Sequence, residues 1–492
     1  SEMCIRDRLL YNQRNYDDGD QVPYRTQGFA GRAAYTYADR YIAEFNFGYN
    51  GSENFAKGNR FGFFPSIAAG WIVSEEEFMR PVQNYINKLK LRASYGLAGN
   101  DRFYNDDGSQ KRFAYITTIG TTDGYKWGNS NAFYDKGGLR EGDPGVESLT
   151  WETVKKANVG IELGLFKMAE LQVDFFHERR EDIFMQRKNI PSSAGFPSAP
   201  WANYGIVTNK GFDISLDLNK QINKDWFISA RASVTYAKNK IVEQDEDLGV
   251  LGTYRSSTGK PVGQIFGLVN DGLYTEADFE DVTTGKLKPG LPVPKFSDRV
   301  YPGDIKYVDF NGDGEITETD KTAIGGTVNP ELVYGFGINL SYKNIDFGAF
   351  FQGNGRTYRI IGENQKNFLP GSTIGAEGNI FTNASDAWTV DNPSQDVFYP
   401  RLHMGYNANN AQVSDWWLKD MSMLRLKNVE LGYSFSKNLI KKAAMEYARI
   451  FVRGTNLLQF SKFDLWDPEL NTSNGLKYPI MATYSIGLQV RF

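Results

Sequence analysis

The last residues of the chain alternate strictly between large apolar side chains and polar or small ones. Successive side chains of a β-strand point to opposite faces, so one face of this segment would be apolar throughout. That face carries Tyr484, Ile486, Leu488, Val490 and Phe492. A strand of this kind that ends on an aromatic residue is typical of an outer-membrane β-barrel, where one face meets lipid and the other a wet lumen. We therefore predict that these five residues form a C-terminal signal for barrel assembly.

The same two-residue period recurs along the chain and predicts about thirteen strands. In each of them one face is apolar and the other is polar or small. The predicted strands cover residues 29–37, 41–49, 61–71, 89–97, 153–163, 170–177, 209–218, 226–236, 332–342, 345–351, 423–435, 449–457 and 484–492. Lys343 and Asn344 separate two of them and predict a hairpin with a minimal turn.

Short and long connections alternate between the predicted strands. The long ones cover residues 98–152, 178–208, 237–331, 352–422 and 458–482, and only residues 50–60 are compact on that side. Outer-membrane barrels have short periplasmic turns and longer extracellular loops. The sequence therefore predicts an all-β, antiparallel transmembrane barrel with long extracellular loops.

Composition limits the alternatives. Mean hydropathy is −0.47, and the sequence has no apolar run of roughly 20 residues, which excludes membrane-spanning helices. The 34 Phe, 28 Tyr and 50 Gly residues suit strands, aromatic girdles and tight turns. They would equally permit a large soluble β-protein. A net charge of −4 without single-sign blocks gives no indication of a nucleic-acid partner.

The N-terminal segment does not follow the strand pattern. We interpret residues 1–25 as a leader or strand-loop remnant, and residues 1–8 as a foreign or broken end, since they contain no apolar core of about 7 to 15 residues as a secretory signal would. Residues 26–492 are then the barrel part. Bacterial single-chain barrels have even strand numbers, so an odd number predicts that the chain is the C-terminal part of a larger barrel.

One internal motif resembles a calcium-binding loop. Oxygen-bearing side chains or a backbone carbonyl occupy loop positions 1, 3, 5, 7, 9 and 12, and Gly314 occupies position 6. The predicted ligands are Asp309, Asn311, Asp313, Glu315, Thr317 and Asp320. We expect a structural Ca²⁺ in this insertion, residues 304–325. The alternative is a solvated acidic turn, because position 12 is an aspartate and no flanking helices are evident.

The surroundings of that loop, together with other stretches, resemble a known family. Residues 303–314, followed by Ile324-Gly325 and residues 330–335, resemble SusC/RagA-type TonB-dependent outer-membrane transporters of Bacteroidota. Further stretches with this resemblance are residues 60–65 with Gly70-Trp71, 89–95 with Gly99-Asn100, Trp151-Glu152 with Asn158 and Gly160, 209–213, 259–264 with Asp271-Gly272, 424–428 and 452–457. The resemblance covers nearly the whole chain after about residue 25.

The resemblance implies a barrel of about 22 strands with a plugged lumen in the bacterial outer membrane. The strands predicted here would be the last ones, and the plug and TonB box would lie outside this chain. The complete protein would import oligosaccharides or, in some members, peptides. Its partners would be a SusD-like surface lipoprotein, the TonB-ExbB-ExbD system acting through the missing part, the substrate and outer-membrane lipid.

Aromatic residues of the long connections are the candidate substrate contacts, since aromatic faces stack on sugar rings. They are Trp127, Trp201, Tyr358, Trp388, Tyr399, Trp416, Trp417 and Trp466. The alternative for each is a place in an interfacial aromatic girdle.

An enzyme is not expected. His177 and His403 are the only histidines, and no pair of carboxylates stands out as a catalytic dyad. The main alternative to an importer is a soluble or surface-attached, calcium-stabilised glycan-binding adhesin.

Overall fold

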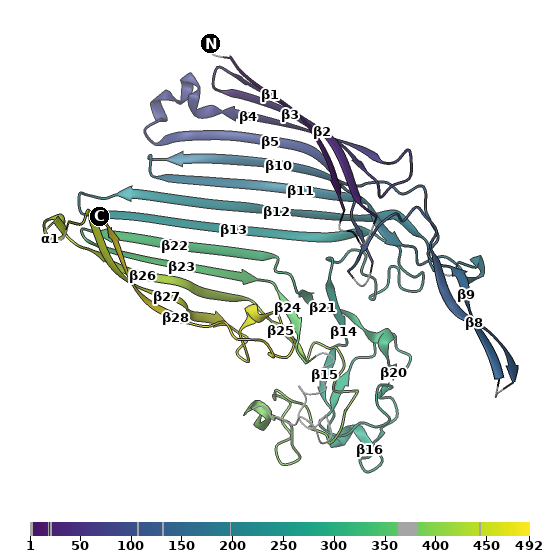
Figure 1. Cartoon of the computed structure of the whole chain (residues 1–492). Coiled ribbons are helices and arrows are strands. Elements are labelled where there is room, and N and C mark those ends of the chain that lie inside the picture. The colour runs from purple at the N-terminus through teal and green to yellow at the C-terminus, as the bar shows by residue number, and fades with distance from the viewer. Residues whose placement is uncertain are drawn as a thin grey trace. The chain divides into compact units, whose positions relative to one another are not determined.

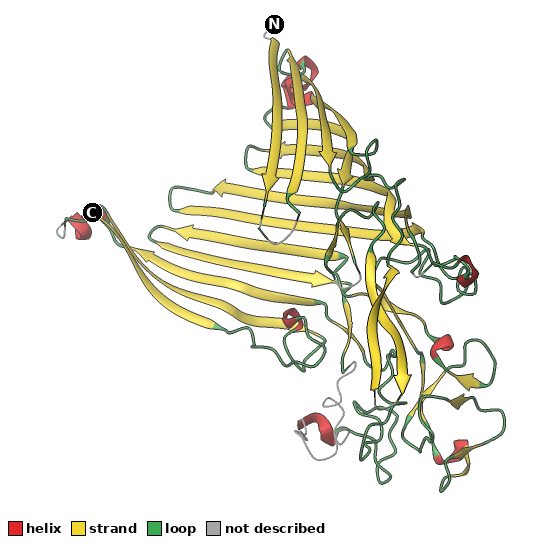
Figure 2. Cartoon of the chain, turned by 45° about the vertical axis from the view of Figure 1, so that its right-hand side comes forward, coloured by secondary structure: helices red, strands yellow, loops and turns green. Residues whose placement is uncertain are grey.

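In the computed structural model of the chain, the regular secondary structure is almost entirely β (Figures 1 and 2). It describes residues 3–17, 19, 22–105, 108–129, 132–196, 198–362, 382–441 and 444–492. Among the described residues, no helix is both long and apolar enough to cross a membrane.

Fourteen strands form one large sheet, and their order in the sheet is their order in the chain. The strands are β1 (Met3–Tyr16), β2 (Tyr24–Tyr37), β3 (Tyr41–Ser52), β4 (Phe61–Ile72), β5 (Ile86–Asn100), β10 (Glu152–Leu165), β11 (Ala169–Gln186), β12 (Trp201–Gln221), β13 (Trp226–Glu243), β22 (Leu332–Tyr342), β23 (Ile345–Gly355), β26 (Met423–Ser434), β27 (Tyr447–Ser461) and β28 (Thr483–Arg491). Consecutive strands run antiparallel, as the register of β2 with β3 and of β27 with β28 illustrates.

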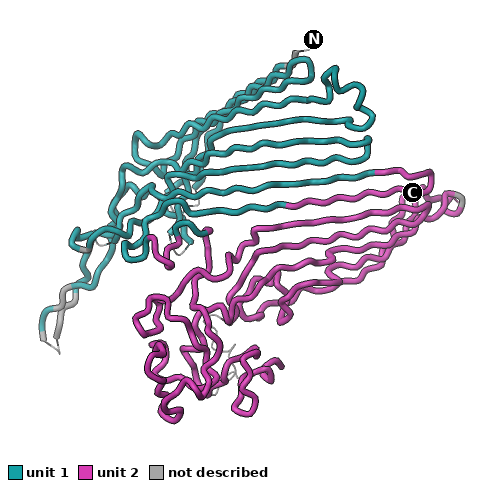
Figure 3. Tube along the Cα trace, turned by 180° about the vertical axis from the view of Figure 1, so that it is seen from behind, with its two compact units in different colours: residues 1–219, 235–251, 258–260 teal, residues 220–234, 252–257, 261–492 magenta. Residues whose placement is uncertain are grey.

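The chain divides into two compact units, which Figure 3 distinguishes. Unit 1 comprises Ser1–Asn219, Thr235–Leu251 and Thr258–Lys260. Unit 2 comprises Lys220–Val234, Gly252–Ser257 and Pro261–Phe492. Strand β13 contributes to both, and each unit is described separately below.

All thirteen predicted strands are present. The hairpin at Lys343 and Asn344 is confirmed: β22 has the predicted bounds, Tyr342 pairs with Ile345, and Lys343 adopts a φ of 51° in the turn. Strands β11, β12 and β13 extend beyond their predicted ends, so the connections predicted at 178–208 and 237–331 are shorter than expected. Backbone pairing continues there although the apolar alternation has ended.

The prediction missed one strand. Residues 3–16, interpreted as part of a leader or strand-loop remnant and not among the predicted strands, form β1, in which Leu9 pairs with Gly31 and Tyr11 with Phe29. The segment was missed because Asp7 interrupts the apolar face and Leu10 lies on the opposite one. With β1 the sheet has an even number of strands, so the argument from an odd strand number does not hold.

The long connections contain small strands of their own. These are β6 (Phe103–Tyr104), β7 (Gln110–Lys111), β8 (Ile119–Asn129), β9 (Ala132–Glu141), β14 (Gln264–Gly267), β15 (Asn270–Leu273), β16 (Phe279–Asp281), β17 (Lys286–Leu287), β18 (Val293–Pro294), β19 (Ile305–Tyr307), β20 (Glu315–Ile316), β21 (Thr322–Thr327), β24 (Tyr358–Ile360) and β25 (Leu418–Asp420). They pair two by two, and β8 with β9 forms a separate hairpin.

Among the residues that the structure describes, helices are few and short. One α-helix, α1, spans Lys437–Ile440 in the connection between β26 and β27. Single 3-10 turns span Val73–Glu75, Glu77–Val82, Ser192–Ala194, Glu276–Asp278, Glu318–Asp320, Thr382–Ser385 and Pro468–Leu470. The long connections predicted after β5, β13, β23 and β27 are present, whereas the one between β11 and β12 is reduced to residues 187–200.

Candidate functional site

The strands of unit 1 have two chemically different faces. On one face the aromatic rings of β2, β3 and β4 pack against each other while remaining exposed, as Tyr49 stacks on Phe61 with ring centroids 5.1 Å apart. On the other face Arg32 forms an ion pair with Glu44 at 2.7 Å. Residues that pair across neighbouring strands lie on the same face of the sheet, so the aromatic rings and the charged side chains stay on separate faces.

An ion pair on the polar face of unit 1 reaches across a whole strand. Arg92 of β5 contacts Asp174 of β11 at 2.6 Å, although β10 lies between them. Gly160 of β10 pairs with both residues, and a Cβ atom at this position would lie 2.4 Å from Asp174 Oδ1 and 2.8 Å from Arg92 Nε. The glycine therefore provides the gap through which the two side chains meet.

Unit 2 repeats this arrangement. Arg449 of β27 forms a two-bond ion pair with Asp346 of β23, with Nε 3.0 Å from Oδ1, and crosses β26 at Gly432. A Cβ atom at Gly432 would lie 2.3 Å from the Arg449 guanidinium. Glu430 joins the same network through Arg449 and Arg453, each at 2.6 Å. Sequence reading did not find these networks, because their members come from separate strands.

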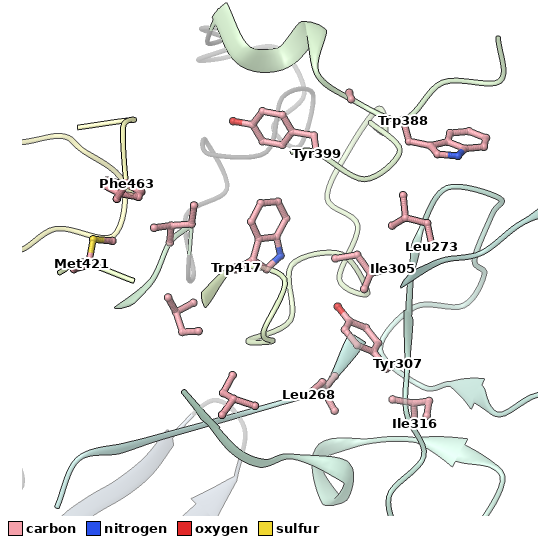
Figure 4. Packing of buried hydrophobic residues seen from close by; sticks show 14 residues of the cluster. Leu268, Leu273, Ile305, Tyr307, Ile316, Trp388, Tyr399, Trp417, Met421 and Phe463 are labelled. Carbon is pink, nitrogen blue, oxygen red and sulfur yellow. The ribbon is translucent and has the colours of Figure 1, made fainter. Parts of the chain in front are cut away.

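The long connections of unit 2 fold around a hydrophobic core (Figure 4). Tyr307 of β19 donates its hydroxyl to the Asn409 carbonyl at 2.7 Å, and the Trp417 indole N–H donates to the Asn410 carbonyl at 2.8 Å. The core residues are Leu268, Leu273, Ile305, Tyr307, Ile316, Ile324, Ile360, Ile361, Ala387, Trp388, Tyr399, Trp417, Met421 and Phe463. The connections thus form a folded module with a core of their own.

This core corrects part of the list of candidate substrate contacts. Trp388, Tyr399 and Trp417 are buried in it, with Tyr399 fully inaccessible. Burial raises the pKa of the Tyr399 hydroxyl to about 12. Their side chains cannot touch a substrate in this arrangement, because core contacts occupy their surfaces. These aromatic residues were predicted to bind substrate because no pattern in the sequence indicates that the connections have a core of their own.

The side chains of the other aromatic candidates are exposed or only partly buried. Trp201 stacks on Phe184 with centroids 4.6 Å apart, and Trp127 is exposed on β8. Trp416 donates its indole N–H to the Phe398 carbonyl at 3.1 Å. Tyr358 lies on β24, and Trp466 packs edge-on against Phe463. The structure does not gather these residues into one site, and they remain individual candidates.

The calcium-like loop adopts the turns that the motif predicts. Gly312 and Gly314 have φ values of 74° and 83°, a region that favours glycine. Asp309 accepts hydrogen bonds from the N–H groups of Gly312 and Gly314 at 2.7 and 2.9 Å. Partial burial alone would raise the pKa of Asp309, but these N–H groups stabilise its charged form and the pKa is lowered overall.

The fit of this loop to a cation is incomplete. Asp320 is buried, and both of its oxygens already accept backbone N–H groups, from Phe310 at 3.0 Å and from Thr317 at 2.8 Å. In the described part of the chain, no three Asp, Glu, His or Cys side chains converge as a metal site. The oxygen donors that remain are Asp309, Asn311, Asp313, Thr317 and the Glu315 carbonyl. Asp320 therefore acts in this structure as the cap of the loop.

Neither histidine lies in a catalytic arrangement. His403 Nε2 lies 2.5 Å from Oδ1 of the buried Asp304, which also accepts from Asn410 Nδ2 at 2.8 Å. His403 is therefore a packed loop residue. His177 is exposed on β11, opposite Lys210 of β12.

The terminal strand has the predicted faces. In β28, Tyr484, Ile486 and Leu488 are among the most exposed large apolar residues of the chain, and Phe492 follows the strand. Ile486 pairs with Val452 of β27.

Comparisons with known proteins agree with this architecture. No family model matches the chain. The TonB-dependent receptor P26 of Formosa agariphila is 30% identical over 506 residues, which cover 97% of this chain and 47% of that receptor. The TonB-dependent receptor SusC of Bacteroides thetaiotaomicron is 25% identical over 500 residues, covering 98% and 46%. The chain thus spans about half the length of the curated relatives it matches.

Solved structures give the same result for the fold. The RagAB peptide importer in its open-open state has a TM-score of 0.72 and 24% identity, covering 96% of this chain and 47% of that one. Its closed-closed state has a TM-score of 0.69. Together with the sequence relatives and the two-faced antiparallel strands, this identifies the chain as a SusC/RagA-like β-barrel sequence of the bacterial outer membrane.

Proposed function

We propose that this chain supplies barrel strands and external loops to a TonB-dependent importer of nutrients. The observation that carries the proposal is the two-faced sheet, with exposed aromatic rings on one face and ion-pair networks on the other, in a chain related to TonB-dependent receptors over 97% of its length. The apolar face suits lipid, and the charged face suits a water-filled lumen.

The partners follow from the same relationship. Energy would come from TonB-ExbB-ExbD, as the relationship to TonB-dependent receptors suggests. A SusD-like surface lipoprotein would cover the long connections, whose core gives them a fixed surface to bind. Oligosaccharides are the proposed substrates. Peptides are the second candidate, because the structural neighbour RagAB is a peptide importer.

Uptake by cells of the source bacterium tests this proposal. Fluorescently labelled oligosaccharides and peptides would be offered to wild-type cells, to cells lacking the gene, and to wild-type cells treated with a protonophore. We expect uptake that is lost in both of the last two cases. Uptake that persists without the gene or without proton-motive force would contradict the proposal, and protein that stays soluble without detergent would favour the adhesin.

We also propose that the 309–320 loop binds Ca²⁺ through Asp309, Asn311, Asp313, Thr317 and the Glu315 carbonyl, with Asp320 as the cap. Extracellular calcium modules bind in the range of roughly 10⁻⁴ to 10⁻³ M. About 1 mM Ca²⁺ should therefore protect this insertion from proteolysis. Asp309→Asn with Asp313→Asn should abolish the protection, and Asp391→Asn, an exposed aspartate of the same unit, should leave it unchanged. Protection that survives the double substitution would contradict the site.

Finally, we propose that the apolar face of β28, together with Phe492, is recognised as a signal during barrel assembly. Deletion of Phe492 from the full-length protein should lower the amount inserted in the outer membrane, measured by heat-modifiable migration. Unchanged insertion would remove the terminal residue from the signal.

A further inference from the structure

Basic residues gather at one place on the apolar face of unit 1, at the loop end of strands β10 to β13. These four strands lie side by side in the sheet (Figure 1). The basic patch consists of Lys155, Arg179, Lys210, Lys238 and Lys240. We infer that it binds the anionic headgroup of a glycolipid in the outer leaflet of the outer membrane. The inference rests on the proposed function, because it requires the apolar face to meet lipid.

Strand pairing places these residues in two rows directly after a row of apolar side chains. Val159 pairs with Phe175, and Phe175 with Phe212, whose ring centroid lies 5.7 Å from that of Tyr236. The next row toward the long connections, on the same face, contains Ala157, His177, Lys210 and Lys238. The row after it contains Lys155, Arg179, Thr208 and Lys240. The face therefore changes from apolar to basic within two residues along each of three strands.

No carboxylate shares these two rows with the basic residues. Glu181, in the following row, forms ion pairs with Lys155 and with Arg179, whose Nε lies 2.6 Å from Oε1. Lys210 and Lys240 are exposed, and no ion pair involves them in the part of the chain that the structure describes. These two ammonium groups are therefore available to an external anion.

The basic patch is local. In the same rows β5 has Tyr95 and Leu97, which pair with Ala157 and Lys155. The loop ends of the strands of unit 2 carry uncharged residues on their apolar face, namely Tyr334, Gly353, Leu424, Phe460 and Tyr484. Lysines that only extend toward water at a membrane interface need no such restriction. Confinement to four neighbouring strands favours a single bound ligand.

The opposite ends of the same strands differ from the patch. There the apolar face of β10 to β13 continues with Leu163, Leu171, Leu216 and Ile228. Long connections of outer-membrane barrels lie outside the cell and short turns lie in the periplasm. The basic residues are thus at the level of the outer-leaflet headgroups only, which selects the lipid of that leaflet.

The dimensions and chemistry of the patch fit an anionic glycolipid. Neighbouring strands lie about 4.8 Å apart, so four strands span roughly 14 Å. One phosphate would occupy a fraction of this width, whereas a headgroup with phosphates and acidic sugars can use all of it. The Arg179 guanidinium matches two oxygens of one anionic group, and lysines act as point charges. Phe175, Phe212 and Tyr236 lie next to the patch, where the acyl chains of the same lipid begin.

Native mass spectrometry of the full-length protein in detergent tests the inference, because each bound lipid adds its own mass. The probe is lipid A with its two attached acidic sugars. Each basic residue near an anionic lipid contributes roughly fivefold to affinity, so Lys210→Gln with Lys240→Gln should weaken binding about 30-fold. Lys210→Arg with Lys240→Arg keeps both charges and should retain the affinity.

Lys220→Gln with Lys224→Gln is the matched control. It removes the same charge from exposed residues around the β12–β13 turn, at the opposite end of the strands, and should leave binding unchanged. Binding that survives Lys210→Gln with Lys240→Gln, or an equal loss in the control, would overturn the inference. Equal melting temperatures of the variants in detergent show that the sheet is intact.

Two further probes separate the possible lipids. Phosphatidylethanolamine has no net charge, and cardiolipin has two phosphates but no sugar. Either of them bound as tightly as the glycolipid would contradict a glycolipid site. Failure of the inference is distinguishable from failure of the import proposal. In the first case cells carrying Lys210→Gln with Lys240→Gln would still show energy-dependent uptake; in the second, uptake would persist without the gene whatever the lipid measurement gives.

Discussion

Unit 2 uses large apolar side chains in two opposite ways. In β28, Ile486 is 77% exposed and Tyr484 75% exposed, whereas in the long connections Trp417 is 3% exposed and Tyr399 is fully buried. In water, exposed apolar surface costs about 25 cal/mol per Å² relative to burial. The connections avoid this cost with a core of their own, and the strands avoid it by facing lipid.

The difference shows that large apolar residues face lipid in one region and are buried away from water in the other. Apolar residues repeated every second position mark a surface that meets lipid. Apolar residues scattered through a connection mark a module that folds in water. Substitutions in one region should therefore have little effect on the other.

The largest effect is expected for Trp417→Ala. Removing a buried tryptophan destabilises a core by about 3–5 kcal/mol, so the connections of unit 2 should open to protease. The strands should stay intact, because lipid holds their apolar face. Limited proteolysis of outer membranes measures cleavage of the connections. Electrophoresis of the protected part with and without heating then shows whether the strands remain folded.

Ile486→Ala is the matched control. Lipid tails replace a side chain on this face at little cost, and we expect less than about 1 kcal/mol of destabilisation. If both substitutions opened the connections equally, the two regions would not be independent.

The polar face can be tested at its glycine gaps. Gly432→Ala would place a methyl group against the Arg449 guanidinium, and overpacking of this kind costs about 1–3 kcal/mol. Gly160→Ala should act similarly on Arg92 and Asp174. Denaturant unfolding of the reconstituted protein measures the loss.

Gly355→Ala in β23 provides the control, since its added methyl group meets Leu332 at an ordinary 3.4 Å. A similar loss in all three variants would show a general effect of glycine replacement instead of a broken ion pair.

A smaller change separates hydrogen bonding from packing in the loop core. Tyr307→Phe removes only the bond to the Asn409 carbonyl, so we expect about 1 kcal/mol of destabilisation. The rate of protease cleavage in the connections should rise by roughly fivefold, in line with that energy. No change would mean that water replaces the hydroxyl group.

The smallest effect is expected when low pH protonates Asp245 in unit 1, because only the connection that contacts this residue should be destabilised. Burial alone would raise its pKa, but Arg187, together with the N–H group of Lys188, lowers it to about 2. The charged form is thus favoured in the folded chain. Its contribution is complete above about pH 4 and is lost as the pH falls through about 2.

Proteolysis of the connection between β11 and β12 at pH 5 and pH 2 follows this loss. Asp245→Asn should remove the pH dependence. Protection that fell with pH in the variant as well would assign the effect to another group.

The sheet could be predicted from the sequence because lipid on one face and water on the other impose a strict two-residue period. Strand β1 was missed where Asp7 breaks that period, and the ends of β11 and β13 were missed where pairing continues without it. The loop core could not be predicted. Trp417 and Tyr399 pack against residues that are distant in sequence, and no local pattern encodes such contacts.

The glycine gaps also bear on how the strands find their alignment. A slip of one residue would turn the apolar face inward, but a slip of two keeps both faces correct. In β10 such a slip would bring Asn158 or Glu162 to the position of Gly160, and the ion pair across the strand could not form. A residue without a side chain thereby distinguishes the correct register from its nearest plausible error while the sheet assembles.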